Sequence, residues 1–252
     1  MPDDQLRPLT SEAYDGFTDA RTLDAGHFQV ESELINYVYF HNSFETANEF
    51  TWQPRITVGL LNNVDFFVRP AYTLGSYSVR APFPPYKYSN GLNEFGNTTT
   101  GVKINLWGND GGTTAFSIRP YLNLPTTQNT GCDDVLGGGD LALLVRLPCE
   151  FSVKFDSEFY ATEFYSPFNG NNVYAGFDNS ISINKSLCSK ANAYWYMNTT
   201  VTTIANPNWT GYTGFGAEYN FTANLQLFAG IGFGLNMPAD VYNPRLGFAW
   251  RF

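Results

Sequence analysis

Charged residues recur on the polar sides of alternating segments in this chain, and their spacing suggests what they could do. Five cations each stand about four to six residues from a predicted tight turn, which puts them at a similar depth in a sheet at ~3.3 Å per residue. These cations are Arg55, Arg69, Lys103, Arg119 and Lys154. Carboxylates predicted to face the same space are Glu31, Glu33, Asp156, Glu158, Asp178 and Glu218. A basic arc facing an acidic arc would set a transverse field across a narrow pore and orient polar solutes.

The same charges have a simpler interpretation, which stays open. About twelve strands enclose far less space than the roughly 16 to 18 of wide porins. Inward cations and anions in nearly equal numbers would then pair with one another and fill the interior.

A hydrolase would need an imidazole base beside a nucleophile. The only histidines are His27, which follows an irregular opening segment, and His41, which begins a predicted loop. Neither has an evident serine partner at matching depth. Asp156 and Glu158 flank a serine at carboxylate-pair spacing, which is a weak signal. The three cysteines form neither a CxxC motif nor a disulfide framework. We therefore predict no catalytic residues, no metal and no cofactor.

A long connection from Gly75 to Gly96 is predicted to hold an aromatic patch. It combines flexible glycines with a stiff Phe-Pro-Pro-Tyr core, and connections of this length are usually functional or disordered. The patch consists of Tyr77, Phe83, Tyr86 and Tyr88. It would bind solutes at the outer entrance, or the segment is a mobile surface loop.

The last eleven residues, 242–252, show which elements position these side chains. Tyr242, Leu246, Phe248, Trp250 and Phe252 share one face, whereas the other face is small or charged. A membrane-spanning β-strand needs this alternation because lipid touches one face and water the other. Ending on an aromatic residue resembles bacterial outer-membrane barrels.

Similar alternation divides the body into twelve predicted strands separated by short turns and longer connections in strict succession. Their ranges are 27–40, 49–60, 64–74, 98–107, 113–124, 139–147, 150–164, 173–184, 190–202, 210–221, 224–236 and 242–252. This asymmetry predicts an all-β fold, a transmembrane antiparallel up-and-down barrel of about twelve strands. Prolines inside predicted strands weaken the local register.

Composition favours the membrane over a soluble eight-stranded barrel or a β-sandwich. Aromatic residues make up 17% of the 252 residues and charged residues only 15%, against about 25% in soluble domains. A net charge of −9 argues against nucleic-acid binding. The opening residues lack the features of a secretion signal, so we expect the mature chain of an exported protein.

We predict an extended leader over 1–26, which could enter the barrel, and a barrel over 27–252. The leader resembles the opening segment of the outer-membrane family called the putative MetA-pathway of phenol degradation. The matching positions are Arg7, Pro8, Thr18, Asp19, Gly26, Phe28, Gln29 and Glu31. Ser32 and Glu33 depart from the family's Gly-rich start, which leaves the shape of the first strand open.

The resemblance implies a barrel of the bacterial cell outer membrane that passes small, often aromatic or apolar, compounds. We therefore expect a channel or transporter that works by passive diffusion. Its partners would be membrane lipid, including lipopolysaccharide, detergent after extraction, and small solutes. A closed structural or adhesion barrel with partner-binding loops is the alternative, and an outer-membrane phospholipase comes third.

Overall fold

The protein is an all-β chain in a computed structural model that describes residues 6–12, 18–41, 45–81, 86–126, 136–166, 170–203, 209–236 and 240–252. Its strands are β1 (Phe28–His41), β2 (Glu45–Trp52), β3 (Arg55–Leu61), β4 (Val64–Arg69), β5 (Tyr72–Ala81), β6 (Tyr86–Phe95), β7 (Thr98–Trp107), β8 (Thr114–Leu124), β9 (Leu136–Leu147), β10 (Phe151–Ser166), β11 (Gly170–Cys188), β12 (Ala191–Thr202), β13 (Trp209–Thr222), β14 (Leu225–Gly234) and β15 (Asp240–Arg251).

Twelve continuous wall strands account for these fifteen segments. Brief breaks divide three wall strands into β2 with β3, β4 with β5, and β6 with β7. Two of the breaks contain Pro54 and Pro70, which cannot donate a ladder hydrogen bond. All pairings are antiparallel, and β15 pairs with β1 from Arg251 opposite Gln29 to Asp240 opposite His41. The sheet therefore closes, and the predicted twelve-stranded antiparallel barrel is confirmed.

The barrel turns its apolar side chains outward and its polar side chains inward. On β15, Trp250 is 52% exposed, whereas its neighbours Ala249 and Arg251 are 0% and 2% exposed. The same alternation appears on β9, where Leu141 is exposed and Ala142 is buried. Among the described residues, no helix is long and apolar enough to span a membrane. An apolar exterior around a polar interior is the arrangement that lipid requires of a spanning barrel.

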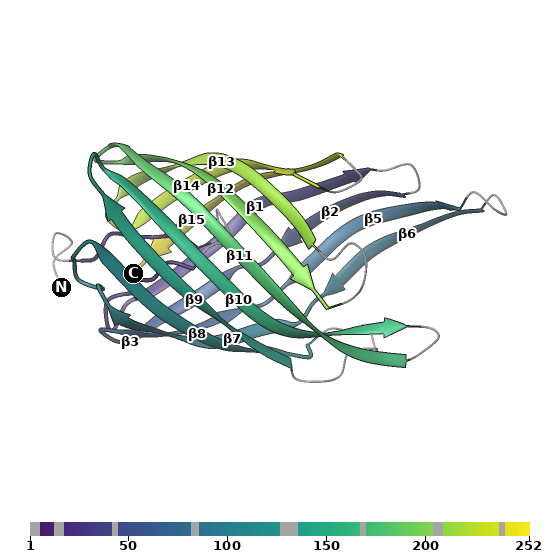
Figure 1. The fold of residues 1–252 in the computed structure, drawn as a ribbon, viewed down its shortest axis with the longest axis horizontal. Coiled ribbons are helices and arrows are strands. Elements are labelled where there is room, and N and C mark those ends of the chain that lie inside the picture. Colours follow the sequence, from purple (N-terminus) through teal and green to yellow (C-terminus); the bar gives the residue numbers. More distant parts are fainter. Residues whose placement is uncertain are drawn as a thin grey trace.

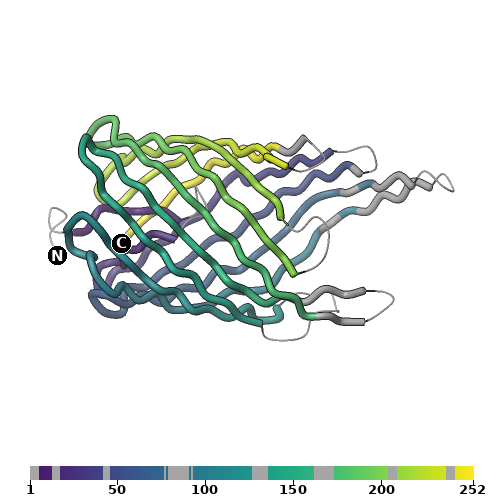
Figure 2. The backbone as a smooth tube through the Cα atoms, in the orientation of Figure 1, coloured from purple at the N-terminus to yellow at the C-terminus, as the bar shows by residue number. Residues whose placement is uncertain are grey.

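Both chain ends lie at the same end of the barrel, together with the short turns (Figures 1 and 2). Short turns lie at the periplasmic end in barrels of this kind. At the opposite end, β5 and β6 extend beyond neighbouring strands (Figure 1). They pair from Tyr72 opposite Phe95 to Ala81 opposite Tyr86. The prediction of one long connection from Gly75 to Gly96 was therefore wrong, because backbone pairing continues through most of it.

Candidate functional site

The described part of the N-terminal segment, residues 6–12 and 18–26, lies inside the barrel and is called the leader segment below. Its residue Glu12 meets three cations of the wall. Lys103 Nζ on β7 donates to Oε1 at 2.7 Å, and Arg119 Nη1 on β8 donates to Oε2 at 2.9 Å. Arg55 on β3 also donates to Oε2. Since the Glu12 side chain is only 5% exposed, these contacts form away from bulk water.

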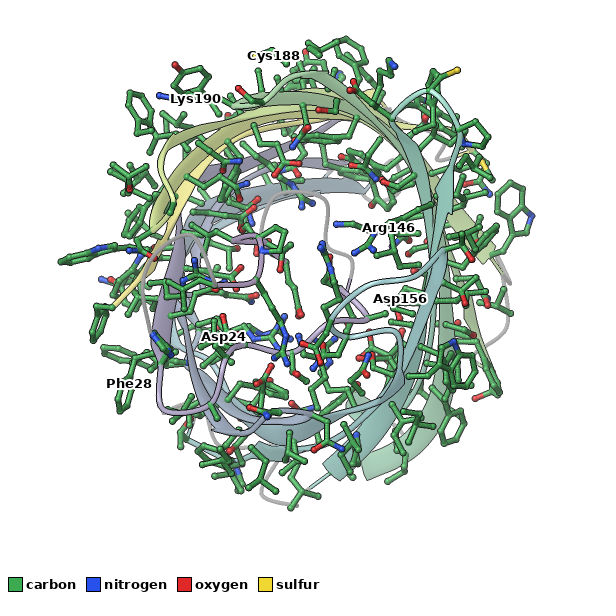
Figure 3. All side chains as sticks on the ribbon, turned by 90° about the vertical axis from the view of Figure 1, so that its left-hand side faces the viewer. Asp24, Phe28, Arg146, Asp156, Cys188 and Lys190 are labelled. Atoms are coloured by element: carbon green, nitrogen blue, oxygen red, sulfur yellow. The ribbon has the colours of Figure 1, made fainter. Side chains whose placement is uncertain are left out.

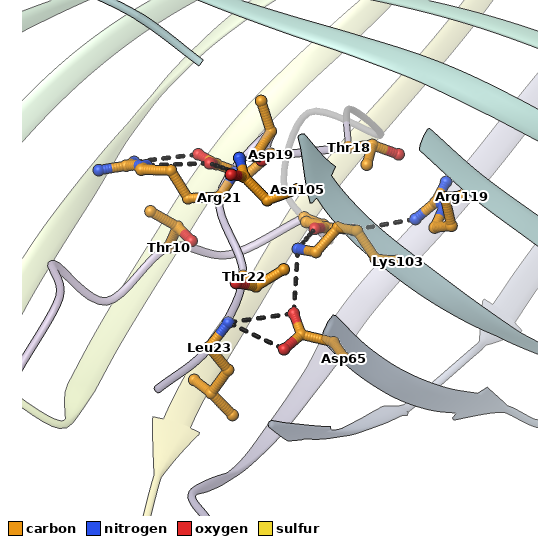
Figure 4. Close-up of polar contacts among 12 residues, drawn as sticks. Thr10, Thr18, Asp19, Arg21, Thr22, Leu23, Asp65, Lys103, Asn105 and Arg119 are labelled. Atoms are coloured by element: carbon orange, nitrogen blue, oxygen red, sulfur yellow. Dashed lines mark hydrogen bonds and ion pairs between the residues drawn. The ribbon is translucent and has the colours of Figure 1, made fainter. Parts of the chain in front are cut away.

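Asp19 forms a second ionic cluster in the leader segment. Arg21 Nε and Nη2 donate to its two carboxylate oxygens, each at 3.0 Å. Lys154 Nζ on β10 lies 3.8 Å from the same carboxylate. Figure 4 shows Arg21 and Asp19 paired beside the wall. The side chain of Asp19 is fully buried, so this contact also ties the leader segment to the lumen.

Backbone groups of the leader segment bond to wall carboxylates. The Leu23 N–H donates to both oxygens of Asp65 at 3.0 Å, and Lys103 Nζ lies 3.5 Å from Asp65 (Figure 4). The Thr18 N–H donates to Asp156 at 3.1 Å. Carboxylate oxygens are good acceptors for backbone N–H groups. The leader segment is therefore held at several points on different strands.

The structure gathers part of the predicted basic arc around the leader segment. Arg55, Lys103 and Arg119 converge on Glu12, and Lys154 meets Asp19. The fifth member, Arg69 on β4, forms no ion pair with the described residues. Arg119 also pairs with Asp140 on the neighbouring β9 at 2.5 Å.

The predicted acidic side chains come from β1, β10, β11 and β13, which lie along one side of the closed barrel. Glu31 accepts the Glu12 N–H at 2.7 Å, Glu33 lies 3.7 Å from Arg245, and Asp156 receives the Thr18 N–H. The others lie on β10, β11 and β13: Glu158, which accepts a bond from the Tyr121 hydroxyl, Asp178, and Glu218, which accepts from Asn192. Leader carboxylates also meet several of the cations, and the transverse field stays a prediction.

Reasoning from the sequence missed Glu12, Asp65 and Asp140 as partners of the cations. Asp65 and Asp140 occupy the inward phase of β4 and β9, since they are 1% exposed while apolar neighbours face outward. Alternation could have found these two residues. Glu12 lies in a segment without periodicity, so no signal of that kind marks it.

Inward tyrosines lie flat against glycines of the neighbouring strands. Tyr194 and Tyr196 on β12 are buried with Phe228 in one cluster. A Cβ atom added to Gly216 or Gly232 would meet the Tyr194 or the Tyr196 hydroxyl, respectively. These glycines thus make room for aromatic rings along the wall.

At the short-turn end, the wall and the leader segment enclose a cavity of about 790 Å³, called the vestibule below. Its lining includes Arg146, Ser152 and Asn184 on adjacent strands, with Lys154 and Gln226. Figure 3 looks into this end and shows Arg146 directed toward the interior, whereas Phe28 points outward. The volume is large enough for a small organic molecule.

Low pH should test the ionic contacts of the leader segment. Burial alone would raise the pKa of Glu12, but Arg55, Lys103 and Arg119 lower it to about 2. At Asp19, burial alone would also raise the pKa of the carboxyl group, but Arg21 and Lys154 lower it. The net result is again a lowered pKa. Because the pKa of Glu12 is lower in the folded state than its ordinary value of 4.5, the ionised carboxylate stabilises the folded state at pH values above 4.5. This contribution to stability disappears as the pH falls toward 2.

We therefore expect the leader segment to stay in place at pH 4 and to be released near pH 2. Pepsin is active at both pH values, and mass spectrometry reports where it cuts. Cleavage within residues 6–26 should begin only near pH 2. Equal cleavage at pH 4 would contradict the assignment.

The fold and its apolar exterior define the class of protein: a β-barrel of the bacterial outer membrane. More particularly, the chain belongs to the family described as "Putative MetA-pathway of phenol degradation", whose model matches residues 11–252. The family resemblance read from the leader is thereby confirmed. Among curated proteins, no sequence matches this chain.

Solved structures share the fold at low sequence identity. An outer membrane channel from Pseudomonas putida F1 is 12% identical with a TM-score of 0.67, over 94% of this chain and 99% of that one. The transport unit of the autotransporter AIDA-I from Escherichia coli is 11% identical with a TM-score of 0.58, over 93% and 92%. The translocator domain of the autotransporter NalP from Neisseria meningitidis is 13% identical with a TM-score of 0.55, over 90% and 89%. These likenesses show the fold.

The remaining predicted residues are only partly placed. Tyr77 lies on β5 and Tyr86 and Tyr88 lie on β6, but their side chains and the whole of Phe83 lie outside the described part of the chain. The aromatic patch therefore stays a prediction. Cys149 and Cys188 are exposed free thiols.

Proposed function

We propose that this protein is a channel through which small solutes cross the outer membrane by passive diffusion. The vestibule supports the proposal: a polar cavity opens at the short-turn end of a closed barrel and continues beside the leader segment. A barrel that only filled its interior would have no need for a hollow of this size. Its lining of charged and amide side chains suits solutes that arrive with water around them.

Aromatic or apolar compounds are the solute class that we propose. Aromatic side chains on the inward side of the wall include Tyr121, Tyr194, Tyr196 and Phe228, all of which are buried. Rings of this kind stack on aromatic solutes while tyrosine hydroxyls keep the passage wetted. The description of the family, which refers to phenol degradation, agrees with this class.

Catalysis is not part of the proposal. A lipid hydrolase would need a histidine beside a nucleophile. Among the described residues, His41 Nδ1 lies 2.8 Å from the Thr46 hydroxyl, and His27 contacts only a backbone carbonyl, so neither meets a serine. We further propose lipid, including lipopolysaccharide, as the surrounding partner and no role in nucleic-acid binding.

The alternative is a closed structural or adhesion barrel whose loops bind a partner. The ionic clusters at Glu12 and Asp19 favour it, because they tie the leader segment across part of the lumen. The two functions differ in whether ions pass through the lumen once that segment is removed.

Single-channel recording in planar bilayers tests the choice. The full chain should conduct weakly, and a chain that lacks residues 1–26 should conduct several-fold more, because the lumen gains the volume that the segment occupied. Absence of conductance from both chains, with heat-modifiable mobility proving that they are folded, would favour the structural alternative. Release of fatty acid from phospholipid would instead support the phospholipase alternative.

A further inference from the structure

The vestibule contains a cation that has no carboxylate partner. Arg146 on β9 donates from Nη1 to the carbonyl oxygen of Gly112 at 2.8 Å, but it forms no ion pair with any described residue. By contrast, Arg119, Lys103 and Lys154 in the same lumen each meet an acid. Arg146 therefore retains donors for an anion from outside the chain, and guanidinium groups bind carboxylates through two parallel bonds.

Four cations and four acids line the vestibule: Arg7, Arg21, Arg146 and Lys154, and Asp19, Asp110, Glu150 and Glu218. Arg21, Lys154 and Asp19 line the same cavity, and Asp19 is the acid that the first two share. Asp110 pairs with Arg7, and Glu218 accepts a bond from Asn192. Among the described residues, none of these acids forms an ion pair with Arg146, so its guanidinium group keeps donors for an anion from outside the chain.

An unused acceptor lies in the same register row as Arg146. Arg146 is opposite Ser152 on β10, and Ser152 is opposite Asn184 on β11. Asn184 is only 7% exposed, and its Oδ1 atom has no hydrogen-bond partner, although its Nδ2 donates to Ser182 at 3.0 Å. A buried acceptor without a donor is unfavourable, so a hydroxyl supplied by a ligand would be favoured there.

The row has the dimensions of a small ligand. Two steps between neighbouring strands, each ~4.8 Å, separate the backbones of Arg146 and Asn184 by about 10 Å. The two side chains shorten this separation, and the remainder suits a molecule with a single ring. Leu144, which lines the cavity two residues from Arg146, supplies an apolar surface for that ring.

We propose that the vestibule binds small organic carboxylates that also carry a hydroxyl group. The carboxylate pairs with Arg146, the hydroxyl donates to Asn184 Oδ1, and the ring rests beside Ser152 and Leu144. This site adds to the proposed channel function a class of solute that the short-turn end would bind. Only the biological role of the site rests on the proposed function.

Isothermal titration of the folded protein in non-ionic detergent tests the site, with 4-hydroxybenzoate as the probe. Benzoate lacks the hydroxyl, and methyl 4-hydroxybenzoate lacks the charge. Arg146→Gln should lower the affinity for 4-hydroxybenzoate at least tenfold. Arg146→Lys, which keeps the charge, should lower this affinity less. Asn184→Ala should lower the affinity for 4-hydroxybenzoate more than the affinity for benzoate.

Lys185→Gln is the matched control. It removes one positive charge next to Asn184 in sequence, but Lys185 contacts Cys149 and lies 4.6 Å from the Phe151 ring, outside the vestibule. This variant should bind as the natural protein does. Equal affinity for the methyl ester, unchanged affinity in Arg146→Gln, or no binding to the natural protein at millimolar concentration would overturn the site. Binding without conductance would instead refute the channel and leave the site standing.

Discussion

Replacing Glu12 with glutamine should free the leader segment and raise single-channel conductance several-fold. Glu12 is the acid shared by Arg55, Lys103 and Arg119, and its side chain is 5% exposed. Breaking a buried ionic contact by removing one partner costs about 3–5 kcal/mol, because the other charges stay buried without compensation. The closed hydrogen-bonded wall does not depend on Glu12, so the cost should fall on the seating of the leader segment.

Trypsin gives a second measurement of the same change. It cuts after arginine, and the Arg7 and Arg21 side chains are only 9% and 13% exposed in the seated state. Glu12→Gln should make the bond after Arg21 cleavable while the barrel keeps its heat-modifiable mobility, whereas the bond after Arg7 stays intact because Pro8 follows it. Glu150→Gln, in an exposed turn at the same end, is the control for loss of one negative charge. Unchanged conductance together with protection from trypsin would show that Glu12 does not hold the segment.

The wall could be predicted from the sequence because lipid on one side and a polar lumen on the other impose a period of two. Alternation at residues 242–252 therefore placed Arg251 inside and Trp250 outside, and the structure agrees. Where pairing continued without an apolar stripe, as in β5 and β6, the same reasoning saw a loop. Backbone pairing carries those strands beyond the neighbouring wall, and backbone pairing by itself leaves no periodic signal in the sequence.

The contacts inside the lumen were harder to predict for a physical reason. Sequence spacing gives the depth of a wall residue, so it brought Arg55 and Lys103 to a common level. It gives no depth for Glu12, because the leader segment has no regular repeat. Which cations pair with the wall and which with the leader depends on the path of an irregular chain through the barrel. Neither the transverse-field interpretation nor the charge-filled interior included Arg146. Its lack of an ion pair with the described residues shows that the pairing of cations with carboxylates is also incomplete.

Substitutions at inward glycines should separate two kinds of crowding. A Cβ atom at Gly216 would meet both the Tyr194 hydroxyl and the backbone carbonyl of Ala229, whereas at Gly232 it would meet the Tyr196 hydroxyl at 2.6 Å and nothing else within 3.5 Å. Backbone cannot move without disturbing the ladder between β13 and β14. Gly216→Ala should therefore cost more than the about 1–3 kcal/mol typical of overpacking, and Gly232→Ala should fall within that range.

A double-mutant cycle then checks the physical cause. Tyr196→Phe removes the atom that Gly232→Ala meets, so the pair should lose less stability than the sum of the single changes. Tyr194→Phe should rescue Gly216→Ala only in part, because the Ala229 carbonyl remains. Urea midpoints of the barrel in detergent measure all of these, and Ala217→Val, on the outward face beside Gly216, should be nearly neutral. Additive costs at Gly232 and Tyr196 would contradict the idea that these glycines hold the tyrosine rings against the wall and so keep the lumen open.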